Sequence, residues 1–239
     1  VERLQAPKDD TNQVYFNFPY SGDIGNEILT VNGLVIGYEK PLLNPISFEL
    51  RKGEKIAIIG KNGIGKSTLI KTLLKIIPSL GGEFKFNEKV KISYFSQTEM
   101  DDLSVTPMQF IQSKRKVFTN LEVRSLLARC GIKAELALRP LKELSGGEEA
   151  KTRLCELTLE KSNILVFDEP TNHLDKVAKQ SLKEVGITDI NTLKPEHILF
   201  NGQDISPAQA VHEKVFEGDV AKIEKMLRLS VLKRVEDIN

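Results

Sequence analysis

The chain has 239 residues, enough for one sizeable α/β domain and a smaller appendage. Its 34 Lys and Arg residues nearly balance 33 Asp and Glu residues, which argues against nucleic-acid binding through bulk charge alone but leaves local basic patches possible. No apolar run approaches the roughly 18 residues of a membrane-spanning helix. The N-terminus has no signal-peptide pattern, and two cysteines without CxxC spacing are typical of a reduced, cytosolic chain.

The first half of the chain alternates predicted loops and strands. Residues 1–26 are polar with scattered proline and glycine, which predicts a linker or arm. Alternating, β-branched segments at 27–38 and 46–53 predict strands. The continuous apolar run at 54–60 predicts a strand buried on both faces, and the next apolar residues recur at helical spacing as far as Ile77.

The second half continues this alternation. Strands are predicted at 90–97 and 163–170, with a mostly helical segment between them at 106–138. A strand followed by a glycine-rich loop, a helix and further buried strands indicates a mostly parallel sheet with helices packed on it.

The loop "GKNGIGKST" at 60–68 fits the phosphate-binding pattern G-x-x-x-x-G-K-[ST] between a strand and a helix. Glycines let the backbone wrap a phosphate closely, and the helix N-terminus adds positive partial charge. Lys66 can bind the β and γ oxygens, and the Ser67 hydroxyl can ligate Mg²⁺. The fixed positions of this pattern are Gly60, Gly65, Lys66 and Ser67.

Two carboxylates end the buried strand in "NILVFDEP". A buried carboxylate is costly unless something pairs with it, and we expect Mg²⁺ to be the partner of Asp168. Glu169 follows directly and is the candidate that orients or deprotonates an attacking water. Together with the phosphate loop, this pair predicts a nucleotide triphosphatase.

The motif "LSGGE" predicts the start of another helix, because Ser145 and Glu148 have capping-box spacing. Gly146 and Gly147 leave the N–H groups of this helix start bare, as an anion site requires. Since Lys66 already serves one phosphate, we expect this second helix end to close on the phosphate of another copy.

With these motifs in this order, residues 29–184 resemble the ATP-binding cassette superfamily. The resemblance implies an α/β P-loop NTPase with a mostly parallel sheet core, an antiparallel β subdomain and a helical subdomain, which binds ATP and Mg²⁺. It assigns the following residues to nucleotide binding: Tyr38, Gly60, Asn62, Gly63, Gly65, Lys66, Ser67, Thr68, Ser145, Gly146, Gly147 and Asp175. It assigns Ser67, Gln97 and Asp168 to the metal.

Several roles rest on the resemblance alone. Tyr38 would stack on adenine, although a core or surface tyrosine at a strand end is the simpler alternative. Gln97 would sense Mg²⁺ and the attacking water, and with Glu169 it forms the catalytic pair. Asp175 would contact a second cassette across a dimer, where "SGG" at 145–147 would bind that partner's γ-phosphate.

The motif "EPTNHLD" at 169–175 resembles the ABC-F family, soluble cassette ATPases that act on the ribosome. The N-terminal stretch, with "VERLQAPKDD" at 1–10, "VYFNFPYSGD" at 14–23 and "LTVNGLVIGY" at 29–38, is similar to the stretch that joins the two cassettes of such proteins, so the chain resembles a second cassette. The resemblance implies that the protein is located in the cytoplasm and that its partners are a second cassette, the ribosome and rRNA. It also implies a role in translation regulation or antibiotic resistance. The basic run "SKRKVF" at 113–118 could face rRNA, but a solvated helical face is favoured.

The resemblance stops after about Glu184, so the domain plan is an arm at 1–26, a cassette at 27–185 and an unassigned segment at 186–239. A cassette needs a histidine that contacts the γ-phosphate, and the surroundings of His197 and His212 fit this role poorly. Apolar spacing after Val220 predicts one or two amphipathic helices. An ATP-binding switch module with little hydrolysis and the ATPase subunit of a transporter therefore remain alternatives to an ABC-F ATPase.

Overall fold

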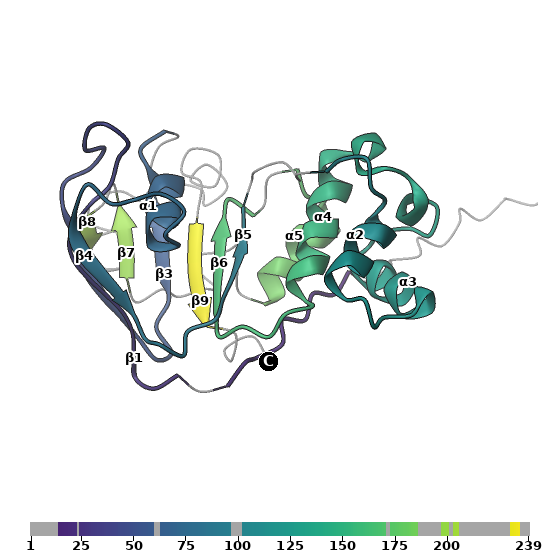
Figure 1. The fold of residues 1–239 in the computed structure, drawn as a ribbon, viewed down its shortest axis with the longest axis horizontal. Coiled ribbons are helices and arrows are strands. Elements are labelled where there is room, and N and C mark those ends of the chain that lie inside the picture. Colours follow the sequence, from purple (N-terminus) through teal and green to yellow (C-terminus); the bar gives the residue numbers. More distant parts are fainter. Residues whose placement is uncertain are drawn as a thin grey trace, which may run out of the picture.

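The computed structural model describes residues 14–22, 24–59, 63–96, 102–170 and 173–185, and the strand backbones at 197–200, 203–205 and 230–234. Figure 1 shows these parts in a row, with an antiparallel sheet at one end, a larger sheet in the middle and a group of helices at the other end.

The smaller sheet has three strands in the order β2-β1-β4, and both pairs are antiparallel. Val31 lies at its centre, opposite Phe48 on one side and Phe84 on the other. Side chains of β2 alternate strictly between buried and exposed, as expected for a sheet that covers a core with one face. Its strands are β1 (Glu27–Val35), β2 (Ile46–Arg51) and β4 (Gly81–Phe86).

The central sheet has six strands in the order β5-β6-β9-β3-β7-β8. The pairs β5–β6 and β3–β7 are parallel, whereas β9 runs antiparallel to both β3 and β6. Four of the strands thus run in one direction, as predicted, and β8 and β9 make the sheet mixed. Its strands are β3 (Ile56–Ile59), β5 (Ile92–Phe95), β6 (Ile164–Asp168), β7 (His197–Phe200), β8 (Gln203–Ile205) and β9 (Ser230–Arg234).

The prediction of a helix was wrong for residues 230–234, which form β9. Strands β3 and β6 are not neighbours, and β9 fills the position between them. Ser230 pairs with Ile58 on one side and with Asp168 on the other, so main-chain groups of both neighbours gain partners. This long-range pairing outweighs the local helical spacing. The rest of the segment from Val220 lies outside the described residues.

Five α-helices occur in the described residues, with two short 3₁₀ turns at Leu136–Leu138 and Leu141–Glu143. Capping boxes begin three of the helices, at Thr106, Thr119 and Ser145, which confirms the predicted cap at Ser145. Within the described parts of the chain, no helix has the length and apolar character to cross a membrane. The helices are α1 (Lys66–Leu73), α2 (Pro107–Lys114), α3 (Asn120–Arg129), α4 (Gly146–Leu157) and α5 (Lys176–Glu184).

Strand β6 separates two hydrophobic cores. Leu165 and Phe167 face the core formed with α2 to α5, where Phe167 makes an edge-to-face contact with Phe18. Ile164 and Val166 face the core shared with α1 and the antiparallel sheet. Burial of both faces explains the continuous apolar run of this strand and fixes the position of its carboxyl end.

The segment at 14–20 packs into the helical core, although its composition predicted an arm. Phe16 and Phe18 have no exposed surface. The amide of Tyr15 donates to the carbonyl of Arg129 at the end of α3. These contacts stabilise the helical core formed by α2 to α5, and α4 and α5 carry part of the site described below.

Candidate nucleotide site

The phosphate loop joins β3 to α1, and two of its glycines adopt left-handed backbone conformations. Gly63 has φ of 78° and Gly65 has φ of 111°, and Gly65 is also the N-cap of α1. L-residues rarely adopt these angles, which explains the two glycines. A Cβ on Gly65 would lie 3.5 Å from the side chains of Ile36 and Leu42, so the turn between those residues lies against the loop.

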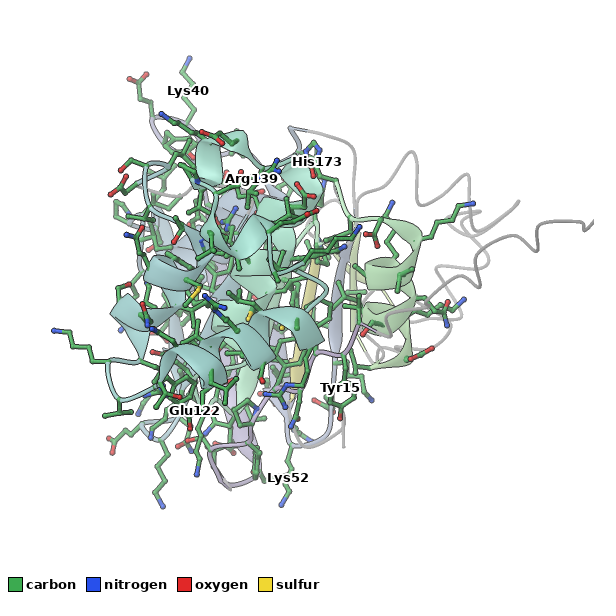
Figure 2. All side chains as sticks on the ribbon, turned by 90° about the vertical axis from the view of Figure 1, so that its right-hand side faces the viewer. Tyr15, Lys40, Lys52, Glu122, Arg139 and His173 are labelled. Carbon is green, nitrogen blue, oxygen red and sulfur yellow. The ribbon has the colours of Figure 1, made fainter. Side chains whose placement is uncertain are left out.

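That turn carries Tyr38, whose side chain is 65% exposed. Figure 2 shows Lys40 of the same turn at the end of the molecule that also holds Arg139 and His173, while Lys52 and Glu122 lie at the opposite end. The structure thus places an exposed aromatic ring on the turn that contacts the phosphate loop. The stacking of Tyr38 on adenine stays a prediction.

Lys66 and Glu169 meet at the centre of the site. The Lys66 Nζ lies 3.7 Å from Oε1 of Glu169, and the two side chains are only 4% and 10% exposed. Glu169 also has a positive φ of 49°, which is unusual for a residue with a side chain. A strained backbone held in place by its surroundings is a frequent feature of functional sites. The tertiary structure therefore brings the predicted phosphate-binding cation to the predicted base.

Asp168 is buried at the carboxyl end of β6, with 3% of its surface exposed. Ser67 follows Lys66 in the first turn of α1 and is partly buried. A carboxylate and a hydroxyl are the oxygen donors that Mg²⁺ prefers, and a buried carboxylate favours a cationic partner. Apart from Gly63 and its two chain neighbours, no heavy atom of the described residues lies within 4 Å of the position that a Cβ on Gly63 would take, so this side of the loop is open. These residues fit Mg²⁺ and phosphate.

Tyr94 on β5 is a residue of this region that the sequence did not single out. Burial, with the nearby negative charge of Asp168, raises the pKa of its phenol to about 12. The hydroxyl therefore keeps its proton at neutral pH. The only signal in the sequence was the position of Tyr94 near the end of a strand that precedes Gln97.

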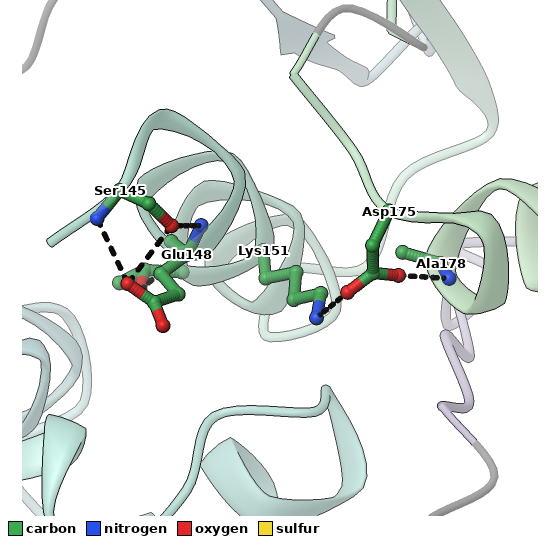
Figure 3. Close-up of polar contacts among 6 residues, drawn as sticks. Ser145, Glu148, Lys151, Asp175 and Ala178 are labelled. Carbon is green, nitrogen blue, oxygen red and sulfur yellow. Dashed lines mark hydrogen bonds and ion pairs between the residues drawn. The ribbon is translucent and has the colours of Figure 1, made fainter.

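Helix α4 begins at the predicted capping box, which Figure 3 shows. The amide of Ser145 donates to Oε2 of Glu148 over 2.8 Å, and the amide of Glu148 donates to the Ser145 hydroxyl over 3.4 Å. A Cβ on Gly147 would lie 2.6 Å from the carbonyl oxygen of His173, and a Cβ on Gly146 would lie 3.3 Å from Cγ of its ring. The two glycines thus permit a close approach of the loop after Glu169, a reason that the sequence did not reveal.

Asp175 ends the same loop and uses both carboxylate oxygens within the chain (Figure 3). Its Oδ1 accepts a hydrogen bond of 2.9 Å from the amide of Ala178 and caps α5, while its Oδ2 pairs with the ammonium of Lys151 on α4. Burial acts to raise the pKa of Asp175, but these hydrogen bonds and the Lys151 charge outweigh it and lower the pKa. The predicted contact of Asp175 with a second cassette is not tested in a single chain.

Arg153, one half-turn further along α4, contacts the end of β5. Its guanidinium donates to the carbonyl oxygen of Ser96 and lies 5.4 Å from the ring centre of Phe95. Gln97 follows Ser96 directly but lies outside the described residues, as do Gly60, Asn62 and His212.

The register of β7 bears on the search for a histidine near the γ-phosphate. His197 pairs with Ile56, the first residue of β3, whereas the phosphate loop follows the last residue of that strand. His197 is therefore at the edge of the sheet opposite the phosphate loop, in agreement with the poor fit of its sequence context.

Two of the basic residues in "SKRKVF" are engaged within the chain. Lys114 pairs with Glu156 over 2.7 Å, and Arg115 donates to the carbonyl oxygen of Leu159. Lys116 stays exposed. Two of the three basic side chains of this run therefore have partners within the chain.

A sequence profile of the ABC transporter family matches residues 43–172, more than half of the chain. The chain belongs to this family. As an ABC ATP-binding domain it has the ABC-type P-loop NTPase fold, which the match to a putative ABC transporter ATP-binding protein of Pyrococcus furiosus supports at 25% identity and a TM-score of 0.55, over 65% of this chain and 82% of that one. A bacterial Atm1-family ABC exporter with ATP bound shares the fold with a TM-score of 0.63, at 19% identity and over 90% of this chain and 45% of that one.

Curated relatives add detail within the family. The chain is 41% identical to the uncharacterized ABC transporter ATP-binding protein YfmM of Bacillus subtilis, over 70% of this chain and 32% of that protein. It is 38% identical to ABC transporter F family member 2 of Arabidopsis thaliana, over 77% of this chain and 28% of that protein. This ABC ATP-binding domain thus spans about a third of the length of these relatives.

Proposed function

We propose that the chain is an ATP-binding and ATP-hydrolysing cassette, formed mainly by residues 27–185. The approach of Glu169 to Lys66 carries this proposal. A lysine beside the phosphate loop binds the terminal phosphate oxygens, and a carboxylate 3.7 Å from its ammonium is close enough to orient or deprotonate a water next to that phosphate. Both groups are buried, so their electrostatic effects are stronger than they would be in water.

Mg²⁺ would be held by Ser67 and Asp168, with Gln97 as the third predicted partner. The ion supplies positive charge that neutralises the phosphate oxygens during phosphoryl transfer. The chain itself contributes the loop amides and Lys66 for binding and Glu169 for the water.

Lys66→Ala tests ATP binding directly. A charge-assisted contact of this kind is worth about 1.5–3 kcal/mol, so we expect the dissociation constant for a fluorescent ATP analogue to rise at least tenfold. Lys71→Ala changes a lysine in the last turn of the same helix and is expected to bind the analogue as the unmodified chain does. Unchanged affinity in Lys66→Ala would contradict the assignment.

At a finer level, we infer an ABC-F protein of the cytoplasm in which two cassettes close around ATP and act on the ribosome, in translation regulation or antibiotic resistance. The motif "EPTNHLD" and the relatives named as F family members support this inference. Co-sedimentation of Glu169→Gln with ribosomes in the presence of ATP tests it, and the same experiment with Lys66→Ala is the control. Binding to detergent-solubilised membrane subunits without ribosome binding would favour the ATPase of a transporter.

One observation favours a second candidate, an ATP-binding switch with little hydrolysis. The register of β7 leaves His197 at the edge of the sheet opposite the phosphate loop. A missing donor to the γ-phosphate typically costs about 10²–10³ in rate. Turnover measured with radiolabelled ATP distinguishes this candidate from a fast ATPase.

A further inference from the structure

Two buried hydroxyl oxygens in the part of the chain that the structure describes have no hydrogen-bond partner. One belongs to Tyr94 on β5, and the other belongs to Ser162, two residues before β6 begins. Proteins rarely bury a polar group without a partner, because its lost hydrogen bonds to water are not replaced. Ser162 precedes the amino end of β6, whereas Tyr94 lies towards the carboxyl end of β5, the edge of the sheet that carries the nucleotide site.

Tyr94 lies on the same face of the central sheet as Asp168. Strands β5 and β6 are parallel, and Tyr94 pairs with Val166. Both side chains pack towards the core shared with α1. Because side chains alternate along a strand, Asp168 points to the same face as Val166, two residues further towards the carboxyl end. Tyr94 and Asp168 are thus diagonal neighbours, a separation that a long aromatic side chain can span.

The electrostatics of the Tyr94 hydroxyl agree with this placement. Burial raises the pKa of the phenol to about 12, and the charge of Asp168 acts in the same direction. The Ser96 hydroxyl has the opposite effect on this pKa, but it does not give the Tyr94 oxygen a partner at hydrogen-bond distance and angle. Tyr94 therefore presents a protonated hydroxyl near Asp168 whose hydrogen-bonding capacity no group of the described residues uses.

The metal site offers a reason for this hydroxyl. Ser67 and Asp168 fit Mg²⁺, and Mg²⁺ usually keeps several waters when a protein supplies only one or two oxygen ligands. Residues behind the ligands of a metal orient those ligands and the bound waters through hydrogen bonds. A phenylalanine would fill the same space as Tyr94 without burying a polar group, so packing explains the ring but not the hydroxyl.

We propose that Tyr94 is a positioning residue of the metal site, whose hydroxyl binds a water of the Mg²⁺ that Ser67 and Asp168 would hold. A metal-bound water donates hydrogen bonds, and a protonated phenol can accept one while it donates its own proton to a carboxylate. Tyr94 would thus fix the ion relative to Asp168. The proposal rests on the proposed ATP-binding function and adds to it a residue that sets the affinity for the metal.

The test compares Tyr94→Phe with Ser162→Ala, which removes the other unpartnered hydroxyl at the far end of β6. The probe is Mn²⁺, which prefers oxygen ligands as Mg²⁺ does and is detected by electron paramagnetic resonance. Mn²⁺ is titrated into each variant with a non-hydrolysable ATP analogue, and the chain is kept in excess so that all of the nucleotide is bound. The affinity for a fluorescent ATP analogue in EDTA and the melting temperature are measured for the same variants.

We expect Tyr94→Phe to raise the dissociation constant of Mn²⁺ about 10- to 100-fold, because groups that orient metal ligands have effects of this size. Its affinity for the fluorescent analogue in EDTA should stay within about twofold. Its melting temperature should not fall, since an unpartnered buried hydroxyl does not stabilise the folded chain. Ser162→Ala should bind Mn²⁺ as the unmodified chain does. If Tyr94→Phe does not fold, Tyr94→Met, which also lacks the hydroxyl, replaces it in the comparison.

Equal Mn²⁺ dissociation constants for Tyr94→Phe and the unmodified chain would overturn the proposal. So would a lower melting temperature or a weaker affinity in EDTA that accounts for the loss of Mn²⁺, because the hydroxyl would then support the fold rather than the metal. An unmodified chain that binds the nucleotide but no Mn²⁺ would overturn it too, while leaving the assignment of ATP binding intact. Failure of the unmodified chain to bind either ATP analogue would instead contradict the proposed function itself.

Discussion

The ammonium of Lys66 and the carboxylate of Glu169 lie 3.7 Å apart although β3 and β6, the strands that precede them, are not neighbours in the sheet. Strand β9 lies between these strands. The long side chains of Lys66 and Glu169 reach towards each other across the width of β9. The spacing between β3 and β6, and with it the geometry of the site, therefore depends on a strand from the end of the chain.

Replacing the carboxylate tests its role in hydrolysis. We expect Glu169→Gln to hydrolyse ATP about 10²–10⁴-fold more slowly, because an amide cannot accept a proton from water. ATP affinity should not fall, because Lys66 loses a competing anion.

If hydrolysis normally separates two closed cassettes, Glu169→Gln should elute as a dimer in size-exclusion chromatography with ATP at high protein concentration. A monomer with ATP bound under these conditions would contradict closure of two cassettes.

The two glycines of α4 should respond differently to alanine. In Gly147→Ala the new Cβ would meet a backbone oxygen at 2.6 Å, so the loop at His173 must move. We expect the free energy of unfolding to fall by about 1–3 kcal/mol, as in overpacked cores. In Gly146→Ala the tight contact is with a side-chain ring at 3.3 Å, and higher helix propensity offsets part of the strain. Urea denaturation measures both, and equal effects would contradict the close approach of this loop.

The ion pair between Asp175 and Lys151 predicts how the free energy of unfolding depends on pH. Because its pKa is lowered in the folded chain, the stabilisation is fully present above the ordinary aspartate value of about 4 and is lost as pH falls through the lowered value. The difference in unfolding free energy between the unmodified chain and Asp175→Asn should therefore shrink from pH 7 towards pH 3. A difference that stays constant or grows in acid would show that the charge of the Asp175 carboxylate does not stabilise the folded chain.

The two cysteines should be chemically inert in the folded chain. Cys130 and Cys155 are buried, and their mutual hydrogen bond together with burial raises the pKa of the Cys155 thiol. The thiolate is the reactive form, so modification by a thiol reagent such as Ellman's reagent should begin only when the chain unfolds in urea. Rapid reaction of either thiol under native conditions would contradict the packing of α3 against α4.

The register of β7 predicts that His197 has little role in hydrolysis. His197→Ala should change the rate of ATP turnover by less than about twofold, because its strand pairs it with the start of β3 rather than the end. The unmodified chain should itself turn ATP over slowly, because the register of β7 places His197 away from the phosphate loop. Fast turnover that collapses in His197→Ala would show that this residue reaches the phosphate.

Short motifs made the site predictable where all their residues act locally. Gly65, Lys66 and Ser67 follow one another at a strand-to-helix junction, and local backbone conformation alone places them together. The capping box of Ser145 and Glu148 is equally local and appears as predicted. The class of fold also followed from the sequence, because the pattern of apolar residues identified strands β1, β2, β3, β5 and β6 and the helical segments that contain α1, α2 and α3. It did not identify β4, β7, β8 or β9.

The tertiary structure alone decided the contacts between distant segments. The sequence could not predict that Lys151 would meet Asp175, that Gly147 would lie close to the carbonyl of His173 or that residues 230–234 would pair with β3 and β6. Nor could the composition of the N-terminal segment show that Phe16 is buried, since this depends on the core formed by other helices. A motif fixes a conformation when its stabilising partners lie within a few residues. Strand pairing, burial and buried ion pairs draw their free energy from partners far along the chain, which only the packed structure brings together.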